Sequence, residues 1–360
     1  MNTVWEDDQS FVHEAVANRV VFGMAAARAD LLAELTRLTA SRVIVIGVNK
    51  LLPTAESFTV SWRDRLVGSF GPDADRQWDD NIADGLVRIQ ALKPDCIVAL
   101  GGGTVISIAR IIGAKAEVPV ICLPTTYSGS ELHRLSQAPS LPDAIIYDPQ
   151  LTVTLPEEST VATAMYALAR GIQACVSRLA SPVSLLVALE GIRALADGLP
   201  DTVLDPEGLS GRSRTLYGSY MTGSAHTFAG SGLQDRVCAV LATEFSVPYI
   251  QSQSVLVPHI AFLNSRIMPQ IMAQIADALG VDDAAVGLFK LAREVGAPGS
   301  LADIGLLRAD VDAAAAACWR SLAEETREGI SESELHQLIE GAWQGRLPDT
   351  PYNVSIQVSF

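Results

Sequence analysis

The sequence predicts an α/β domain with a parallel sheet, followed by an all-helical domain. Apolar runs typical of buried strands alternate with helical spacing through the first 155 residues, as expected for a parallel sheet. After LPDAIIYDPQLTVTLP (141–156) the strand signal fades, and only helical patterns follow. We therefore predict domains at 1–155 and 156–360.

Composition and charge narrow the class of protein. The chain has 360 residues, of which 49% are hydrophobic, enough for two buried cores. The formal net charge of -15 disfavours nucleic acid and anionic membranes as partners. The acidic start MNTVWEDDQSFVHEA has no apolar segment of signal-peptide length, so we expect a cytoplasmic protein. Five scattered cysteines without CxxC spacing predict buried free thiols.

The first half contains regularly spaced element signals. Strands are predicted at 19–22, 42–47, 65–70, 95–100 and 118–126, and helices at 24–39, 79–92 and 104–115. The segment 95–126 is the clearest βαβ unit, for which a right-handed crossover is expected. Residues 51–62 are irregular and end in Trp62, which we expect to be exposed.

The second half contains helical patterns alone. They cover 158–178, 182–198, 211–229, 232–244, 268–279, 284–295, 308–326 and 331–344. Pro248, Pro258 and Pro298 are expected to interrupt them, because proline disfavours a helix interior. His259 follows Pro258, and we place it at a helix start.

The first candidate binding motif is Gly101-Gly102-Gly103-Thr104, which follows a predicted buried strand. Glycines allow a ligand or another backbone to approach closely. The helix that follows directs free N–H groups at that point, which suits a phosphate or pyrophosphate. The alternative is a tight strand–helix turn that binds nothing.

The second motif is PTTYSGSE (124–131), which also follows a strand at its carboxyl end, where open α/β sheets bind ligands. We predict cofactor contacts from Thr125, Thr126, Tyr127 and Ser130. The alternative is a polar loop whose Ser128 or Ser130 caps the next segment.

These two motifs, with RVVFG (19–23) and IIYDPQLTVTLP (145–156), resemble the iron-containing alcohol dehydrogenase superfamily, and its maleylacetate reductase branch most closely. EGIRAL (190–195), LYGSYMTG (216–223) and VLVPHIAFLN (255–264) extend the resemblance to roughly residues 18–345. It implies the dehydroquinate synthase/iron alcohol dehydrogenase-like fold, with a Rossmann-like dinucleotide-binding domain and a helical domain that completes the active-site cleft. It also implies NAD or NADP as cofactor and a homodimer.

The metal-binding positions depart from the family pattern of one Asp and three His. The residues at or beside these positions are Tyr166, Arg170, Gln234, Asp235, Ala239, Tyr249 and Gln253, and His259 is retained. A transition metal needs converging imidazole, thiolate or carboxylate ligands, so we expect no bound iron or zinc. The family's Lys-bearing hairpin is reduced to 132–144, without Lys, which weakens the expectation of cofactor binding; Lys50 would favour NADP, or is a solvated surface residue.

The replacement residues suggest metal-free roles. Arg170 and Arg236 could stabilise an oxyanion or hold a carboxylate, and Tyr166, Tyr249 or His259 could donate a proton. Asp235 could pair with either arginine. The alternatives are that Arg170 forms a structural ion pair, that both tyrosines fill the volume left by the metal, and that His259 is a packed core residue.

Three functions remain open from the sequence. The first is a metal-independent NAD(P)-dependent reductase that acts on a small anionic carbonyl or enone substrate. The second is a non-redox cyclase, isomerase or lyase of specialised metabolism that reuses the cleft. The third is a catalytically silent binding protein.

Overall fold

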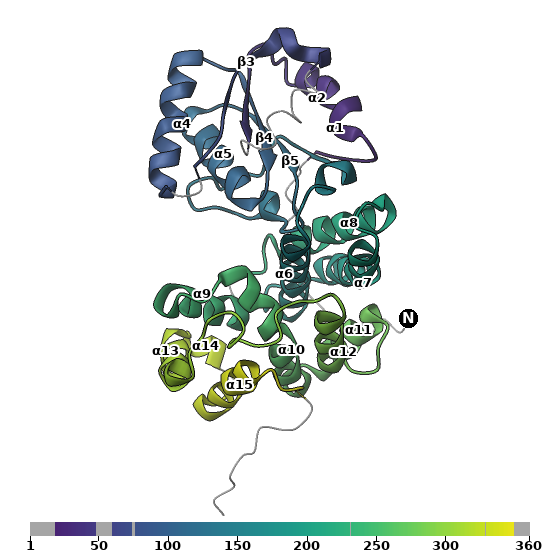
Figure 1. Cartoon of the computed structure of the whole chain (residues 1–360), viewed down its shortest axis with the longest axis vertical. Helices are drawn as coiled ribbons and strands as arrows, with labels where there is room; N and C mark the ends of the chain where they lie inside the picture. The colour runs from purple at the N-terminus through teal and green to yellow at the C-terminus, as the bar shows by residue number, and fades with distance from the viewer. Residues whose placement is uncertain (1–18, 48–59, 74–75, 231, 328, 349–360) are drawn as a thin grey trace, which may run out of the picture.

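The structure is a computed structural model, and it describes residues 19–47, 60–73, 76–230, 232–327 and 329–348. Its N-terminal part is built around a parallel sheet, and its C-terminal part is helical (Figure 1). This is the predicted fold class. The assignment to Lys50 lies outside the described residues.

The sheet has six parallel strands in the order β1-β6-β5-β4-β2-β3. Their bounds are Val20–Phe22 (β1), Val43–Gly47 (β2), Leu66–Phe70 (β3), Cys96–Gly101 (β4), Val120–Pro124 (β5) and Ala144–Tyr147 (β6). The inner strands β2, β4, β5 and β6 are buried along their whole length. That burial explains why they are continuous apolar runs rather than alternating ones.

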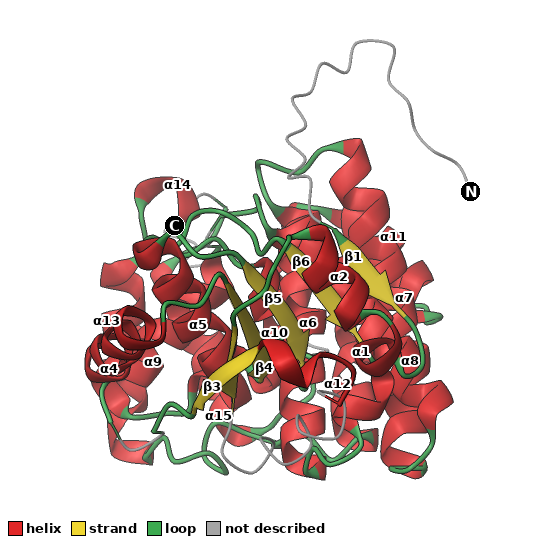
Figure 2. Ribbon diagram, turned by 90° about the horizontal axis from the view of Figure 1, so that it is seen from above, coloured by secondary structure: helices red, strands yellow, loops and turns green. Residues whose placement is uncertain are grey.

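Helices cover both faces of the sheet (Figure 2). Helices α4 (Trp78–Leu92) and α5 (Gly103–Ala116) lie on one face, and α1 (Ala26–Ala29) and α2 (Leu31–Arg37) lie on the other. The single helix predicted at 24–39 is therefore two helices, which divide at Asp30. Trp62, expected to be exposed, is fully buried in the core beside α1 and α2.

The helical part begins with α6 (Glu157–Val176), which packs against α7, α8 and α10. Most of α6 is buried, as expected for a helix surrounded by others. The remaining bounds are Pro182–Leu204 (α7), Leu209–His226 (α8), Leu233–Phe245 (α9), Tyr249–Ile267 (α10), Pro269–Leu279 (α11), Ala284–Glu294 (α12), Val311–Ser321 (α13), Glu324–Arg327 (α14) and Glu332–Gln344 (α15).

Helix α10 was missed in the sequence. Pro258 lies inside it, and α7 likewise continues through Pro200. A proline removes one backbone hydrogen bond and disfavours the helix interior, but α10 packs against α6, α9 and α12. This packing outweighs the local preference, so His259 lies in mid-helix and the predicted helix start there is wrong.

Two further features concern cysteines and membranes. All five cysteines are buried and free, as predicted, and burial raises the pKa of the Cys96 thiol to about 12. Within the described ranges, none of the helices combines the length and apolar character that a membrane span requires.

Candidate functional site

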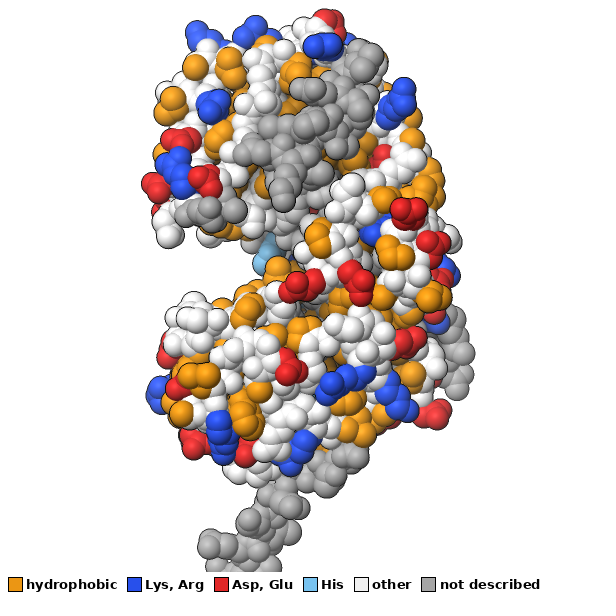
Figure 3. Space-filling model, viewed as in Figure 1, with side chains coloured by type: hydrophobic (Ala, Val, Ile, Leu, Met, Phe, Trp, Pro, Cys, Tyr) orange, Lys and Arg blue, Asp and Glu red, His pale blue; other side chains and the backbone are white. Residues whose placement is uncertain are grey.

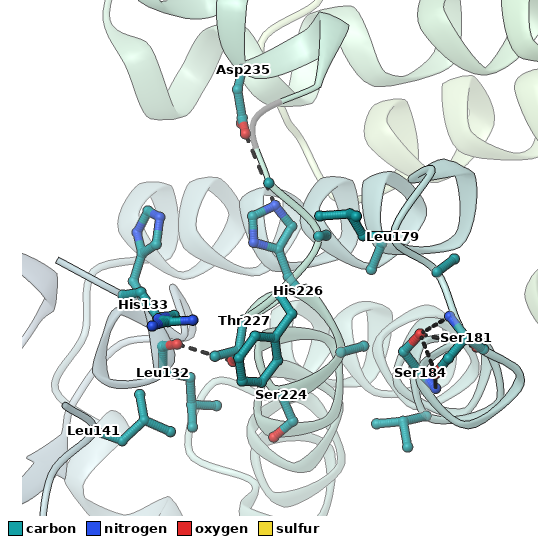
Figure 4. Close-up of a pocket in the computed structure, with 18 of the residues that line it drawn as sticks. Leu132, His133, Leu141, Leu179, Ser181, Ser184, Ser224, His226, Thr227 and Asp235 are labelled. Carbon is teal, nitrogen blue, oxygen red and sulfur yellow. Dashed lines mark hydrogen bonds and ion pairs between the residues drawn. The ribbon is translucent and has the colours of Figure 1, made fainter. Parts of the chain in front are cut away.

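A hollow separates the α/β part from the helical part on one face of the molecule (Figure 3). A cavity of about 900 Å³ is lined by the 132–141 loop, by the N-terminal end of α7, and by residues 220–235 around the α8–α9 connection. Figure 4 shows His133, His226 and Asp235 among its walls. This volume lies in the range of small-molecule sites.

The glycine motif forms the junction of β4 and α5. Gly101 ends the strand, Gly102 is the N-cap of α5, and no side chain caps that helix. Its first N–H groups are therefore open to a ligand. A Cβ atom added at Gly103 would lie 2.5 Å from Ser130 Oγ, and one at Gly102 would lie 2.9 Å from Thr126 Cγ2. The glycines thus let the two predicted motifs touch.

The second motif places hydroxyl groups beside that helix end. Thr125 N donates to Gly101 O over 3.1 Å, which ties the motif to the end of β4. Ser128 Oγ lies 2.9 Å from Ser130 Oγ and 3.4 Å from Thr126 Oγ1. Small hydroxyls next to an uncapped helix N-terminus fit the pyrophosphate of NAD or NADP. Thr104 is exposed at the same end.

Tyr127 was also predicted to contact the cofactor, but its side chain is fully buried. Its hydroxyl donates to Thr152 Oγ1 over 2.9 Å and accepts from Arg212 over 3.1 Å. Burial raises the pKa of this phenol. Tyr127 therefore anchors the motif in the core and does not face a ligand.

Arg170 connects the helical part to the second motif. Its Nη1 donates to the main-chain oxygens of Ser128 and Gly129 over 3.0 and 3.1 Å. Its Nη2 lies 3.3 Å from Nδ1 of His226, and its guanidinium carbon lies 5.6 Å from the centroid of the Tyr166 ring. Arg170 is 1% exposed, so it orients a loop rather than presenting a free cation to the cavity.

Asp235 has other partners than the predicted ones. It accepts hydrogen bonds from Gln173 Nε2 at 2.8 Å, from the Tyr249 hydroxyl at 3.2 Å and from Gln253 Nε2 at 3.4 Å. Nε2 of His226 lies 3.9 Å from the Asp235 carboxylate, beyond hydrogen-bond distance. The expected pairing with Arg170 or Arg236 is therefore wrong, because Arg170 is held by the second motif.

The other two residues predicted on α9, Gln234 and Arg236, do not line the cavity. The Gln234 amide is buried and donates to Gln253 O over 3.1 Å. Arg236 is exposed and is not among the residues that line the cavity. Its predicted role in binding a substrate carboxylate stays a prediction without support from its position.

His226 is a site residue that the sequence did not reveal. An arginine can only donate, so Nδ1 of His226 accepts from Arg170, and the ring proton lies on Nε2. Nε2 has no hydrogen-bond partner among the described residues. Burial, then the Arg170 charge, lowers the pKa of His226 well below the usual value. The imidazole is therefore neutral. Its position beside Arg170 follows from the packing of α6 against α8, which the sequence does not reveal.

Three residues were predicted as proton donors. Tyr166 is buried, with its ring centroid 6.1 Å from that of Tyr249, and burial raises the pKa of its hydroxyl. His259 is 2% exposed within α10, where burial lowers its pKa to about 4. Of the three, only Tyr249 lines the cavity. Burial, with the Asp235 charge, raises the pKa of Tyr249, so its hydroxyl keeps its proton.

The shortened 132–144 loop is held by an arginine that the sequence did not single out. Arg110 of α5 donates to the main-chain oxygens of Ser130, His133, Ala138 and Ser140, over 2.6 to 3.4 Å. These bonds fix the loop that carries His133 and Arg134 into the cavity wall. A single buried guanidinium thus orders a loop that has no regular secondary structure of its own beyond its first turn.

The expected metal positions do not form a ligand set. In the described part of the chain, no three His, Cys, Asp or Glu side chains converge so that they could hold a metal ion. The Arg170 guanidinium lies among Tyr166, His226 and the second motif. A permanent cation and amide groups do not fit iron or zinc.

Comparisons with known proteins complete the description. A family model described as iron-containing alcohol dehydrogenase matches residues 17–140, and one for the C-terminal part of the Fe-containing alcohol dehydrogenase family matches residues 160–343. The chain is 30% identical to maleylacetate reductase 1 of Rhodococcus opacus over 355 residues, which cover 95% of this chain and 99% of that protein. It is 32% identical to maleylacetate reductase of Burkholderia cepacia over 352 residues, which cover 94% and 99%. The crystal structure of maleylacetate reductase from Agrobacterium tumefaciens superposes with a TM-score of 0.88 at 28% identity, covering 95% of this chain and 100% of that one.

Proposed function

The chain belongs to the iron-containing alcohol dehydrogenase family, and from this premise we propose that it is a metal-independent, NAD(P)-dependent reductase. Its similarity over nearly the whole length is to maleylacetate reductases. We propose a small anionic substrate with a carbonyl or enone group, bound in the cavity between the two parts. We also propose a cytoplasmic homodimer.

Cofactor binding is supported by the contact between the two glycine- and hydroxyl-bearing motifs. The uncapped start of α5 and the hydroxyls of Thr126, Ser128 and Ser130 lie together. Gly102 and Gly103 leave room for this contact. When bound, the dihydronicotinamide supplies a hydride to the substrate carbon, and a proton must then reach the oxygen.

Metal independence is supported by the chemistry of the residues at the former ligand positions. By the sequence resemblance, Arg170 stands where a histidine is expected. The Gln234 amide donates to the main-chain oxygen of Gln253, and the Gln253 amide donates to Asp235. Tyr249 lines the cavity and keeps its hydroxyl proton, which it donates to Asp235 over 3.2 Å. For Tyr249 to stabilise a developing oxyanion, this hydroxyl must turn from Asp235 to the substrate oxygen.

The test is a titration of the full chain with NADH and with NADPH, followed by nicotinamide fluorescence. We expect saturable binding of at least one of the two at micromolar to low millimolar concentration. Absence of binding of both at millimolar concentration would reject the reductase and leave the non-redox enzyme or the silent binding protein.

A further inference from the structure

We propose that the cavity accepts a monoanion with an apolar body of about the size of an aromatic ring, and that it rejects dicarboxylates. This inference rests on the proposed substrate site and names the substrate class more narrowly. It follows from the chemistry of the cavity wall, from its charges, and from the position of the one carboxylate in it.

The wall is largely apolar. Leu132, Leu141, Val187, Phe228 and Ala239 line it, and Leu179 and Val183, at 67% and 43% exposure, are uncovered apolar side chains that belong to the same wall. Figure 4 shows Leu141 and Leu179 on opposite sides of the space, with Ser181 and Ser184 beyond Leu179. An apolar ligand surface would be removed from water here, which favours binding.

The wall carries one permanent positive charge. Among the described residues that line the cavity, Arg134 is the only Lys or Arg. Its guanidinium carbon lies 5.3 Å from the centroid of the Phe228 ring, so a cation is held next to an apolar surface. Such a pair fits a ligand that carries one carboxylate on an apolar body.

The two histidines of the wall do not add positive charge. His226 is buried, and burial, then the Arg170 charge, lowers its pKa well below the usual value. His133 is exposed, and an ordinary histidine pKa of about 6.5 leaves its imidazole mainly uncharged at neutral pH. At neutral pH both rings are therefore uncharged hydrogen-bonding groups. Arg170 and Arg110 are buried behind the wall and do not line the cavity. Their Nη atoms bond to main-chain oxygens and, for Arg170, to His226, so neither presents a free Nη donor to a second carboxylate.

Asp235 makes a second substrate carboxylate unfavourable. Its three hydrogen-bond donors are neutral, namely Gln173, Gln253 and Tyr249. These bonds stabilise the carboxylate without cancelling its charge. Since Asp235 is itself part of the wall, a dianion would bring like charges together in a partly enclosed space, where repulsion is stronger than in water.

The experiment compares two probes that share a cis-4-oxo-2-enoate core. Maleylacetate carries a carboxymethyl group on the ketone, and cis-4-oxo-4-phenylbut-2-enoate carries a phenyl group there. Binding to the full chain is measured by calorimetry, with and without NADP⁺. We expect the phenyl acid to bind at least tenfold more tightly. Equal or tighter binding of maleylacetate, or no binding of either acid at millimolar concentration, would overturn the inference.

Two variants test the charges one at a time. Asp235→Asn removes the negative charge at nearly constant shape, and we expect it to tighten maleylacetate binding about tenfold while the phenyl acid changes little. Arg134→Gln should weaken the phenyl acid about tenfold but leave its uncharged methyl ester unaffected. Arg193→Gln removes a half-exposed charge paired with Glu190 on α7, outside the wall, and serves as the control with no expected change.

These outcomes separate the substrate class from the redox proposal. Ligand binding is read directly, so a chain that prefers the phenyl acid yet fails to bind NADH and NADPH supports the substrate class and rejects the reductase. A chain that binds NADPH but prefers maleylacetate supports the reductase and rejects the proposed substrate class. Insensitivity of both acids to Arg134→Gln and Asp235→Asn would count against the charge argument.

Discussion

The Nη1 atom of Arg170 donates to the main-chain oxygen of Ser128 over 3.0 Å. This bond joins α6 of the helical part to the loop proposed to hold the cofactor. The same guanidinium contacts Nδ1 of His226, so one side chain orients both a cofactor loop and a wall residue of the cavity. Arg170 therefore acts as a structural cation between the two parts of the chain.

Arg170→Ala should lower the free energy of unfolding by about 2–4 kcal/mol, because buried main-chain oxygens lose a charged donor. It should also weaken NAD(P)H binding, since the 128–129 segment is released. Urea unfolding and nicotinamide fluorescence measure the two effects. Arg170→Lys keeps the charge but has a single nitrogen, so it cannot serve the two main-chain oxygens and His226 Nδ1 at once, and it should rescue stability only in part. Wild-type cofactor affinity in both variants would contradict the orienting role.

Gly103→Ala should displace the second motif, because the new Cβ would meet Ser130 Oγ at 2.5 Å. We expect a loss of about 1–3 kcal/mol in unfolding free energy and at least tenfold weaker NAD(P)H binding. Gly23→Ala is the matched control, since nothing lies within 4 Å of its added Cβ. Cofactor binding that is equal in the two variants would show that the junction is not the cofactor site.

Metal analysis of the purified protein should find iron and zinc well below one ion per chain, because Arg170 and the two Gln amides are poor ligands. Dialysis against a chelator should leave NAD(P)H binding and any turnover unchanged. Stoichiometric metal, together with loss of turnover on chelation, would overturn metal independence. The control is a metal-dependent alcohol dehydrogenase treated in parallel.

His259 should make the protein less stable in acid. Burial lowers its folded-state pKa to about 4, whereas its unfolded pKa is about 6.5. The unfolded chain therefore binds the proton first, and stability falls as the pH drops from about 6.5 towards 4, by up to about 1.4 kcal/mol per pH unit. Urea unfolding of wild type and His259→Gln between pH 5 and 8 should show a flatter dependence in the variant. Parallel curves would refute a neutral buried His259.

Local sequence determined the sheet and the two binding motifs. Buried parallel strands must be apolar on both faces, so the continuous apolar runs of β2 and β4 can be recognised in the sequence. Glycines at a strand–helix junction and hydroxyls after the next strand are likewise local signals, and their contact follows from strand adjacency. The five buried thiols were also predictable, because each lies in an apolar run.

Only the tertiary structure decided the composition of the cavity. Asp235 bonds to Gln173 and Tyr249 rather than to Arg170, and His226 meets Arg170 although 56 residues separate them. Likewise α10 continues through Pro258 because it is packed against neighbouring helices. The physical reason is that side-chain partners depend on how α6, α8, α9 and α10 pack, and helical spacing along one segment does not specify which faces of different helices meet.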